Sequence, residues 1–390
     1  MSKADLVALS QRPGVSPLLA ALGEGWVRFV GGAVRDSLLG DGVHDLDFAT
    51  THSPFEVMRR LGTVGIKTVP TGLAHGTVTA ISEGQTAEVT TLRADIATDG
   101  RHATVAYTDD WMADAQRRDF TVNAMYWDPW RGELFDPFGG EADLEAGLVR
   151  FIGDAQVRIA EDHLRILRFF RFHARFGRGS PDEASLAACV VRANDLMALS
   201  RERIADELLK LLSLAEPGPT LAIMLGNSIL SPVLPEIGAA MLPRLGRLVV
   251  AERSSAVDPD PIRRLAALLP SDPITAEKIA VRLKFSRRQR KRLALAASTD
   301  LASRPQALAY EIGIEAAQDR LLLADQPDHA ATLSSWAVPH LPIGGGVLIK
   351  RGILPGPAVA STLRMIERDW IAAGFPEDEQ FDRIVDRVLA

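Results

Sequence analysis

The 390-residue sequence predicts an α+β protein in which an N-terminal mixed-sheet domain is followed by helices alone. Up to about residue 140, short apolar runs alternate with turn and cap signals, as in small mixed domains. After Gly139-Gly140 the strand signals disappear and long amphipathic segments dominate. The composition, 47% hydrophobic and 24% charged, is that of a globular protein and excludes disordered and collagen-like chains. The length predicts two or three domains.

Five β-rich runs form the predicted sheet, at residues 26–30, 45–50, 63–69, 76–82 and 87–92. Gly31-Gly32 ends the first run, and residues 33–39 follow as a short helix that Gly40 closes in the left-handed position. A second helix begins at Ser53. We expect Ser53 as its N-cap, Pro54 in its first turn and Glu56 completing a capping box.

The remaining residues predict a series of amphipathic helices. They lie at residues 154–176, 199–214, 261–269, 275–283, 287–297, 307–324 and 357–373. Joints that contain proline separate several of them, at 216–220, 258–261 and 269–273. We therefore expect the helical part to be divided into sub-domains.

Charge is unevenly distributed along the chain. The net charge of −6 argues against a protein that coats nucleic acid over its whole surface. Residues 158–178 nevertheless carry six arginines against Glu161 and Asp162, and residues 282–292 carry seven cations and no acid. Each cluster either follows a phosphate backbone or is a solvated helix face.

The sequence lacks paired cysteines, a signal peptide and a membrane-spanning segment. The single cysteine, Cys189, excludes an internal disulfide and a cysteine-rich zinc site. The N-terminal segment lacks the apolar core of a signal peptide. The longest stretch free of Lys, Arg, Asp and Glu, residues 329–349, is interrupted by proline and glycine and makes a poor membrane span. We expect a soluble, cytoplasmic protein.

A pair of aspartates at residues 45 and 47 is the central chemical feature. Asp45 and Asp47 flank Leu46, and the period of two along a strand places both carboxylates on one face. Adjacent carboxylates repel unless a cation lies between them, and such a pair suits Mg²⁺ shared with substrate phosphates. The alternative is two solvated carboxylates.

Four neighbouring features extend this site. Gly31 and Gly32, between a strand and a helix, allow close approach of a phosphate to helix N–H groups. Arg35, one turn further, adds a bidentate phosphate contact. Glu88, on another predicted strand, supplies a third carboxylate for phosphoryl or nucleotidyl transfer. The alternative for the glycines is an ordinary turn, but the order of strand, glycine pair, arginine-bearing helix and carboxylate strand within one short segment favours the site. The alternative for Glu88, a surface glutamate, stays open.

The segment RRDFTVNA, residues 117–124, offers further nucleotide contacts. Arg118 can reach a triphosphate or sugar oxygen, and Asp119 or Asn123 can hydrogen-bond a ribose 2′-hydroxyl. The alternative is a capped helix start, in which Asp119 and Thr121 satisfy free backbone N–H groups. Both interpretations can hold together.

The segment EDHLRILRFFRF, residues 161–172, suggests recognition of a base. Asp162 and Arg165 are three residues apart and are expected on one helix face, with Arg168 and Arg171 continuing the row. A carboxylate accepts from an exocyclic amine, and an arginine donates to the adjacent ring nitrogen. Cytosine and adenine present that edge, whereas uracil and guanine do not. The alternative is an ordinary intrahelical ion pair.

These motifs together resemble a known family. The segments GGAVRDSLLG, DLDFAT, RRDFTVNA, DPFGGEADL, EDHLRILRFFRF and LSRERIADELLKLL occur in the order found in the class II tRNA nucleotidyltransferases. These are the CCA-adding enzymes and the related bacterial poly(A) polymerases of the DNA polymerase β-like superfamily. Residues 342–370 resemble the tail of the family, so the resemblance runs nearly from end to end.

The resemblance implies a head (1–140), a neck that recognises the base (141–215), a body (216–285) and a tRNA-binding tail (286–390). It implies addition of C, C and A to the tRNA 3′ end from CTP and ATP. By motif, Asp45 and Asp47 would bind Mg²⁺. Contacts to the nucleotide would come from Gly32, Arg35, Arg118, Asp119, Asp162, Arg165, Arg168 and Arg171, with Glu161 setting the geometry of the base-reading pair.

Three rivals remain. A poly(A) polymerase shares the motifs but tends to carry a basic C-terminal extension, whereas this chain ends in an acidic helix. CC-adding relatives are shortened before RRDFT, whereas residues 93–116 look full length, with 94–110 read as a mobile lever or an ordinary loop. A silent RNA-binding homologue is disfavoured because Asp45 and Asp47 are both present.

The chain departs from the family pattern in two places. Val347 stands where the family's tail commonly has an aspartate, and no phosphatase domain is expected. The sequence leaves the oligomeric state open.

Overall fold

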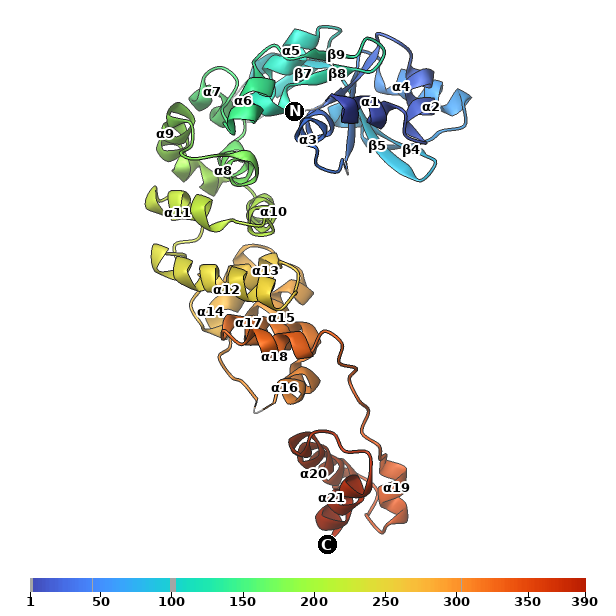
Figure 1. Cartoon of the computed structure of the whole chain (residues 1–390), viewed down its shortest axis with the longest axis vertical. Helices are drawn as coiled ribbons and strands as arrows, with labels where there is room; N and C mark the ends of the chain where they lie inside the picture. The colour runs from blue at the N-terminus through green and yellow to red at the C-terminus, as the bar shows by residue number, and fades with distance from the viewer. Residues whose placement is uncertain (1–2, 44, 99–102, 303) are drawn as a thin grey trace. The chain divides into compact units, whose positions relative to one another are not determined.

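The computed structural model describes residues 3–43, 45–98, 103–302 and 304–390. It divides into two compact units. Unit 1 comprises Met1–Leu211 and Ile223–Val233, and unit 2 comprises Leu212–Ala222 and Leu234–Ala390. The described sheets lie in unit 1, and unit 2 is helical in its described part (Figure 1). The predicted α+β class is therefore confirmed. The division into head, neck, body and tail stays a prediction.

A seven-stranded mixed sheet with the order β3-β4-β5-β2-β1-β8-β9 forms the centre of unit 1. Neighbouring strands are antiparallel except β2 and β5, which are parallel. A separate hairpin joins β6 and β7. The strands are β1 Val27–Val30, β2 Leu46–Thr50, β3 Lys67–Gly72, β4 Thr77–Ser82, β5 Gln85–Thr91, β6 Arg93–Thr98, β7 Ala103–Tyr107, β8 Tyr126–Asp128 and β9 Glu133–Phe135.

Helices of the first half of the chain pack against this sheet or follow it. Helices α2, α3 and α4 contact its strands, and α1 contacts α2 and α3. The bounds are α1 Ala4–Ser10, α2 Val15–Leu22, α3 Gly32–Leu39, α4 Pro54–Thr63, α5 Trp111–Gln116, α6 Gly140–Ala146, α7 Ala155–Glu161, α8 Arg165–Phe176, α9 Glu183–Val191, α10 Arg201–Leu212 and α11 Gly218–Gly226.

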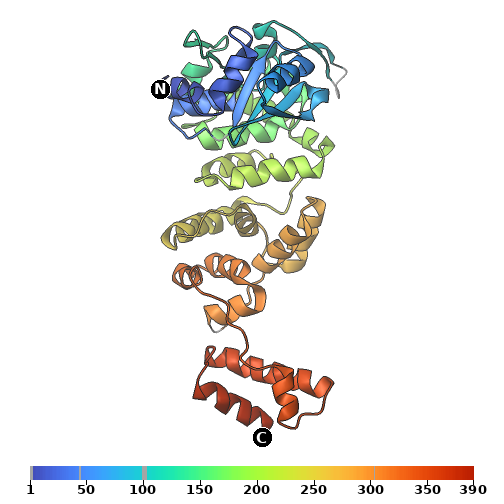
Figure 2. The ribbon, with the colours of Figure 1, turned by 90° about the vertical axis from the view of Figure 1, so that its right-hand side faces the viewer.

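Unit 2 continues with helices only in its described part. They are α12 Leu242–Ser254, α13 Pro261–Leu268, α14 Pro273–Arg282, α15 Arg287–Ala296, α16 Pro305–Ile312, α17 Ile314–Leu323, α18 Pro327–Thr332, α19 Gly345–Lys350, α20 Pro357–Ala373 and α21 Glu379–Leu389. The last three lie together, as both ribbon views show (Figures 1 and 2), around a core that includes Leu348, Ile366 and Trp370. Short 3₁₀ turns occur at 73–75, 121–123, 193–198 and 239–241.

The local signals at the start of the chain are mostly confirmed. Strand β1 ends at Val30, and Gly31 has φ of 60°, a conformation that favours glycine. Gly40 closes α3 in the left-handed conformation. Ser53 caps α4 by accepting from the N–H of Glu56. The predicted capping box does not form. The Glu56 carboxylate accepts from Arg59 and Arg60 on the same helix and not from the N–H of Ser53.

Several expected elements are corrected. The strand predicted over 63–69 is wrong in its first part, because α4 extends to Thr63 and β3 begins only at Lys67. Residues 94–110, interpreted as a mobile lever or an ordinary loop, are not a plain loop. Residues 94–98 and 103–107 belong to the paired strands β6 and β7, and 99–102 lie outside the described residues. Strands β8 and β9 went unpredicted because three residues are too few to show a period. The segment 307–324 is two helices, broken at Gly313.

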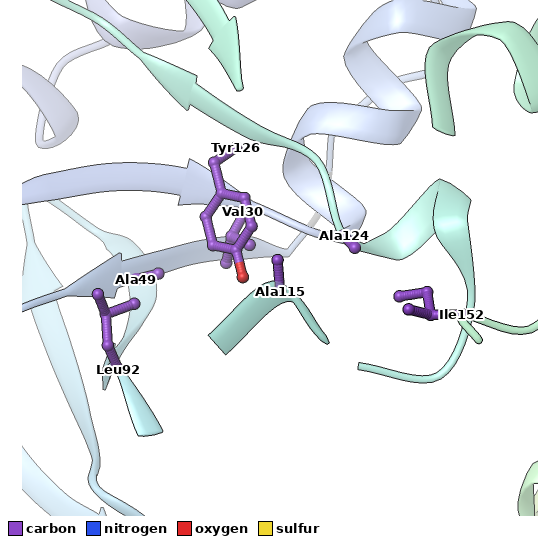
Figure 3. Close-up of a cluster of buried hydrophobic side chains, with 7 residues drawn as sticks. All are labelled: Val30, Ala49, Leu92, Ala115, Ala124, Tyr126 and Ile152. Carbon is purple, nitrogen blue, oxygen red and sulfur yellow. The ribbon is translucent and has the colours of Figure 1, made fainter. Parts of the chain in front are cut away.

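A buried apolar cluster includes residues of the central strands β1 and β2, close in sequence to the predicted site residues. It brings together Val30, Ala49, Leu92, Ala115, Ala124, Tyr126 and Ile152 (Figure 3). The Tyr126 ring extends from its strand toward Ala115, with its hydroxyl at the far end (Figure 3). Since the ring is fully buried, its hydroxyl needs hydrogen-bond partners. It finds them among the charged residues described next.

Candidate active site

A cavity of about 360 Å³ in unit 1 collects many of the predicted site residues. It is bordered by Val30 and Phe48 of the sheet and by Leu164 beside α8. Three aspartates line it, namely Asp47, Asp119 and Asp162. The arginines that line it are Arg93, Arg117, Arg118, Arg165, Arg168 and Arg203. Six cations against three anions make it an environment suited to an anionic ligand.

The cavity is distinguished by its charge and not by its size. A larger cavity, of about 600 Å³, lies beside α7 and α9, and none of the predicted site residues lines it. Its walls include alanines of α9 and the aromatic rings of Phe138 and Phe151. We assign the candidate active site to the smaller cavity because the titratable groups converge there.

Asp47 lies among other carboxylates. It faces Glu88 across the parallel pair β2–β5, where the two residues are directly in register. Burial, followed by the charges of Glu88 and Asp45, raises the pKa of Asp47 to about 6. Asp45 is exposed and precedes β2 by one residue, so only Asp47 is part of the strand. Asp47 and Glu88 are therefore neighbours on adjacent strands, and Asp45 lies exposed just before β2.

The donor set fits a divalent cation shared with a substrate. Among the described residues, no three His, Cys, Asp or Glu side chains lie close enough to hold a metal by themselves. Mg²⁺ usually keeps several waters and takes one or two carboxylates plus substrate phosphates, so a complete protein cage is not required. Burial raises the pKa of Asp47 most, and the charges of Glu88 and Asp45 raise it further; a bound cation would relieve this second, repulsive contribution.

The diglycine turn lies beside Asp47. A side-chain carbon on Gly32 would lie 3.6 Å from Oδ2 of Asp47 and 3.7 Å from a terminal nitrogen of Arg35. One on Gly31 would lie 3.6 Å from a terminal nitrogen of Arg118. Gly31 is buried and Gly32 is half-buried, and the turn brings their backbone close to two arginines and a carboxylate. This is the environment expected for a phosphate-binding turn.

Arg35 itself is buried and fully engaged within the protein. It donates to Oδ1 of Asn123 at 2.5 Å, pairs with Asp36 at 2.8 Å and stacks on the ring of Phe176. Burial lowers the pKa of Arg35, and Asp36 opposes that shift. The predicted phosphate contact of Arg35 stays a prediction; in this structure Arg35 joins the turn to Asn123.

Arg118 is held by a network that the sequence did not reveal. Asp114, on α5, accepts from Arg117 at 3.0 Å and from Arg118 at 3.1 Å, and the hydroxyl of Tyr126 donates to it at 2.7 Å. Burial alone would lower the pKa of Arg118, but Tyr126 and Asp114 raise it above its ordinary value. Asp114 lies three and four residues before the two arginines, a spacing that marks such pairs on a helix.

Asp119 and Asn123 hold each other and a third residue. Asn123 donates to Oδ1 of Asp119 at 3.0 Å, and Arg168 donates to Oδ2 at 2.6 and 2.8 Å. Burial would raise the pKa of Asp119, but Arg168 and the hydrogen bond from Asn123 lower it, so the carboxylate is ionised. Ribose contacts by Asp119 or Asn123 stay a prediction. Thr121 donates to Asp143 and does not cap a helix.

The sequence predicted that Asp162 and Arg165 lie on one helix face, and this prediction is wrong. Helix α7 ends at Glu161, Asp162 is extended with φ −151° and ψ 106°, and α8 begins at Arg165. The Asp162 carboxylate accepts from the N–H of Leu164 at 3.1 Å, a local hydrogen bond that competes with helix continuation. The expected single segment 154–176 is broken for this reason. Both side chains nevertheless line the same cavity.

Arg165 is positioned by three acceptors. Glu161 accepts from it at 2.6 Å, and the carbonyl oxygens of Arg158 and Arg117 accept at 2.9 and 3.1 Å. A guanidinium has five N–H donors, so two remain for a ligand. The Asp162 carboxylate also accepts from Arg203 of α10 at 2.8 Å, a contact that the sequence did not predict. Only the fold brings these two residues, 41 positions apart, together.

The remaining arginines of α8 each have a carboxylate partner on another element. Arg168 binds Asp119, and Arg171 donates to Glu207 of α10 at 2.6 Å. Arg175 pairs with Asp36 of α3 at 3.2 Å. The predicted row of arginines on one helix is confirmed, and it connects α8 to α3, α10 and the segment before the 3₁₀ turn at Thr121–Asn123.

Family models match two parts of the chain. Residues 27–150 match the poly A polymerase head domain, and residues 180–241 match a probable RNA- and SrmB-binding site of polymerase A. The matched head contains the mixed sheet and its carboxylates. Fold and site together define a nucleotidyltransferase.

Similar proteins narrow the class. The chain is 35% identical over 370 residues to the mitochondrial CCA tRNA nucleotidyltransferase 1 of Mus musculus, covering 90% of this chain and 83% of that protein. The Homo sapiens protein of the same name is 33% identical with the same coverage. A CCA-adding enzyme of Bacillus stearothermophilus, solved in complex with CTP, has a TM-score of 0.76 at 26% identity and 96% coverage of both chains. The chain belongs to the CCA tRNA nucleotidyltransferase family.

None of the described helices is both long enough and apolar enough to cross a membrane.

Proposed function

We propose that this protein adds C, C and A to the 3′ end of tRNA, using CTP and ATP without a nucleic-acid template. The observation that carries the proposal is that one cavity of about 360 Å³ in unit 1 is lined by the strand carboxylate Asp47 together with Asp162 and Arg165. Catalytic carboxylate and base-reading pair are thus within reach of one nucleotide. The relatives named above, similar over most of their length, support the same activity.

In this proposal the chain's own residues bind and orient the nucleotide. Arg118, with its raised pKa, stays charged and holds the triphosphate beside the diglycine turn. The two free donors of Arg165 meet a ring nitrogen, and Asp162 accepts from the exocyclic amine. An ionised carboxylate has about four acceptor sites, and each Asp162 oxygen uses one within the protein, so acceptor capacity remains.

We further propose that Asp45 and Asp47, with Glu88 beside them, hold Mg²⁺. The cation would activate the attacking hydroxyl and offset charge on the departing phosphate. The tRNA 3′-hydroxyl attacks the α-phosphate and pyrophosphate leaves, so no covalent enzyme intermediate forms. A cytoplasmic location stays a prediction, since the mouse and human relatives are named mitochondrial proteins.

The proposal is tested with tRNA that lacks its 3′ end, Mg²⁺ and each NTP supplied separately and together. Incorporation of C, C and then a single A is expected. Long A tails would instead establish a poly(A) polymerase, which the matched head family also includes by name. No incorporation, with tRNA still bound, would establish a silent RNA-binding homologue.

A further inference from the structure

Asp114 of helix α5 is a buried carboxylate to which the proposed function gives no role. It is 1% exposed and lies behind Arg93, Arg117 and Arg118, which line the cavity of the candidate active site. Burial would raise the pKa of Asp114, but the charges of Arg118 and Arg117 lower it, so the carboxylate is ionised at neutral pH. A buried charge requires partners that donate to it. The donors around Asp114 therefore show which groups it holds.

The Oδ2 atom of Asp114 holds Arg118. It accepts from Nε of Arg118 at 3.3 Å and from one terminal nitrogen at 3.1 Å. The Tyr126 hydroxyl donates to Oδ2 at 2.7 Å and accepts from Nε of Arg118 at 2.9 Å, which closes a triangle of hydrogen bonds. The other terminal nitrogen of Arg118 donates to the carbonyl oxygen of Asn123 at 3.4 Å. Within the described residues these contacts use three of the five N–H donors, so two are left for a phosphate.

The Oδ1 atom of Asp114 holds Arg117 and, through it, Arg165. It accepts from Nε of Arg117 at 3.0 Å and from the backbone N–H of Arg93, the first residue of β6, at 3.1 Å. The carbonyl oxygen of Arg117 in turn accepts from Arg165 at 3.1 Å. Arg117 is thus fixed through its side chain by Asp114, and its backbone fixes the arginine assigned to the base.

We propose that Asp114 is a positioning residue for nucleotide selection, which directs Arg118 to the triphosphate and, through Arg117, directs Arg165 to the base. The proposal rests on the proposed function for the roles of Arg118 and Arg165. A long, flexible side chain loses rotamer freedom when it binds a ligand, and fixing it beforehand lowers that cost. One carboxylate fixes both arginines, so its loss should weaken phosphate binding and base choice together.

The contacts of the two oxygens can be removed separately. Tyr126→Phe removes the hydroxyl that joins Arg118 to Asp114 and keeps the buried ring. Arg117→Ala removes the side chain that Oδ1 holds and leaves Arg118 paired with Asp114. Asp114→Asn removes the charge that serves both oxygens, with little change of shape. For each protein, kcat and KM are measured with CTP and UTP on tRNA lacking its 3′ end. Calorimetric titration without tRNA gives the Kd of each nucleotide.

Each variant has its own expected pattern. Tyr126→Phe should raise KM and Kd about threefold for CTP and UTP alike, the size of one lost hydrogen bond, with the preference for CTP unchanged. Arg117→Ala should lower the preference for CTP over UTP about tenfold, because Arg165 loses its fixed acceptor. The charge lost with Arg117 weakens both nucleotides equally, so the ratio reports the position of Arg165. Asp114→Asn should raise KM for CTP about tenfold and also lower the preference about tenfold.

A merely structural role gives a different pattern. Partial misfolding of Asp114→Asn would lower kcat equally for both nucleotides, through a smaller active fraction, and would leave both KM values and the preference unchanged. That pattern, or wild-type kinetics, would overturn the proposal. Thermal unfolding shows whether Asp114→Asn folds. Where it does not, the other two variants decide: an unchanged preference in Arg117→Ala, or an unchanged KM in Tyr126→Phe, would overturn the proposal.

The matched control is Asp110→Asn, the same substitution at the N-cap of the same helix. Asp110 is exposed and accepts from the N–H of Met112 at 2.8 Å. Asparagine caps a helix as well as aspartate does, so this hydrogen bond is kept. KM, Kd and the preference for CTP should equal those of wild type.

The two proposals fail separately. A wild-type protein that adds no nucleotide but binds CTP, with a Kd that Asp114→Asn raises and a preference over UTP that it lowers, would contradict the proposed function and support positioning by Asp114. A wild-type protein that completes CCA, with an Asp114→Asn variant of wild-type Kd, KM and preference, would do the reverse.

Discussion

Two arginine–carboxylate networks, one in each unit, use the same chemistry with different results. In unit 1, Arg165, Arg168 and Arg171 pair with carboxylates, and their side chains remain 15–31% exposed. Arg165 and Arg168 line the cavity of the candidate site. In unit 2, Arg263 and Arg264 of α13 meet Glu252 and Asp319 with 0–5% exposure. The first network leaves donors free for a ligand, whereas the second is enclosed by its helices.

The difference shows how burial decides the role of an ion pair. Arg264 is fully buried. It also donates to the carbonyl oxygens of Leu212 and Leu214, so its N–H donors find their acceptors within unit 2. Arg165 retains unused donors beside an accessible cavity. A closed network contributes to the stability and specificity of the fold, and an open one contributes to binding.

The largest expected effect is at Asp47, which lines the same cavity as Arg165 and Arg168. Asp47→Asn removes the charge that the proposed cation requires, and kcat for CTP incorporation should fall about 10⁴-fold, equivalent to about 5 kcal/mol. Dissociation of tRNA should change little. Asp5→Asn, an exposed position on α1, is the control. Turnover within threefold of wild type would exclude Asp47 from catalysis.

A substitution in the closed network of unit 2 should lower the free energy of unfolding and leave kcat unchanged. Glu252→Ala leaves Arg263 and Arg264 without their shared acceptor, and removing one partner of a buried pair costs about 3–5 kcal/mol. Urea denaturation followed by circular dichroism should show this loss. The kcat of the folded protein should stay near the wild-type value. A normal unfolding midpoint would show that the enclosed network contributes nothing.

Base choice sharpens the comparison further. Arg165→Ala removes the free donors, and a bidentate base contact provides about 1–3 kcal/mol of discrimination. The preference for CTP over UTP in kcat/KM should therefore fall by roughly 10- to 100-fold. Arg59→Ala, which breaks an exposed ion pair on α4, should leave the preference unchanged. Retained selectivity in Arg165→Ala would refute base reading by this residue.

The smallest effect is expected where both side chains of an ion pair remain largely exposed to solvent. Glu216 and Arg253 of unit 2 form a pair in which both side chains remain about 60% exposed. Exposed pairs contribute about 0–1 kcal/mol, so Glu216→Ala should hardly move the urea midpoint. A loss comparable to that of Glu252→Ala would mean that burial does not separate the two classes.

Short-range features of the fold could be predicted because local signals encode them. Helix α20 spans the predicted residues 357–373, with proline at its start and glycine after its end. Gly40 and the N-cap Ser53 act as expected. The break at Asp162 was missed because periodicity of the apolar residues continues through it, while a single side-chain hydrogen bond to Leu164 decides the backbone.

The sequence by itself determined the fold class, the order of its motifs and the residue types available for chemistry. Tertiary structure alone decided which of them meet. Asp119 and Arg168 pair across 49 positions, and Arg171 meets Glu207 across 36. It also paired three arginines of the basic run 282–292 with carboxylates elsewhere in unit 2. The physical reason is range: a helix or strand period fixes directions over a few residues, whereas burial and ion pairing depend on the surfaces that packing brings together.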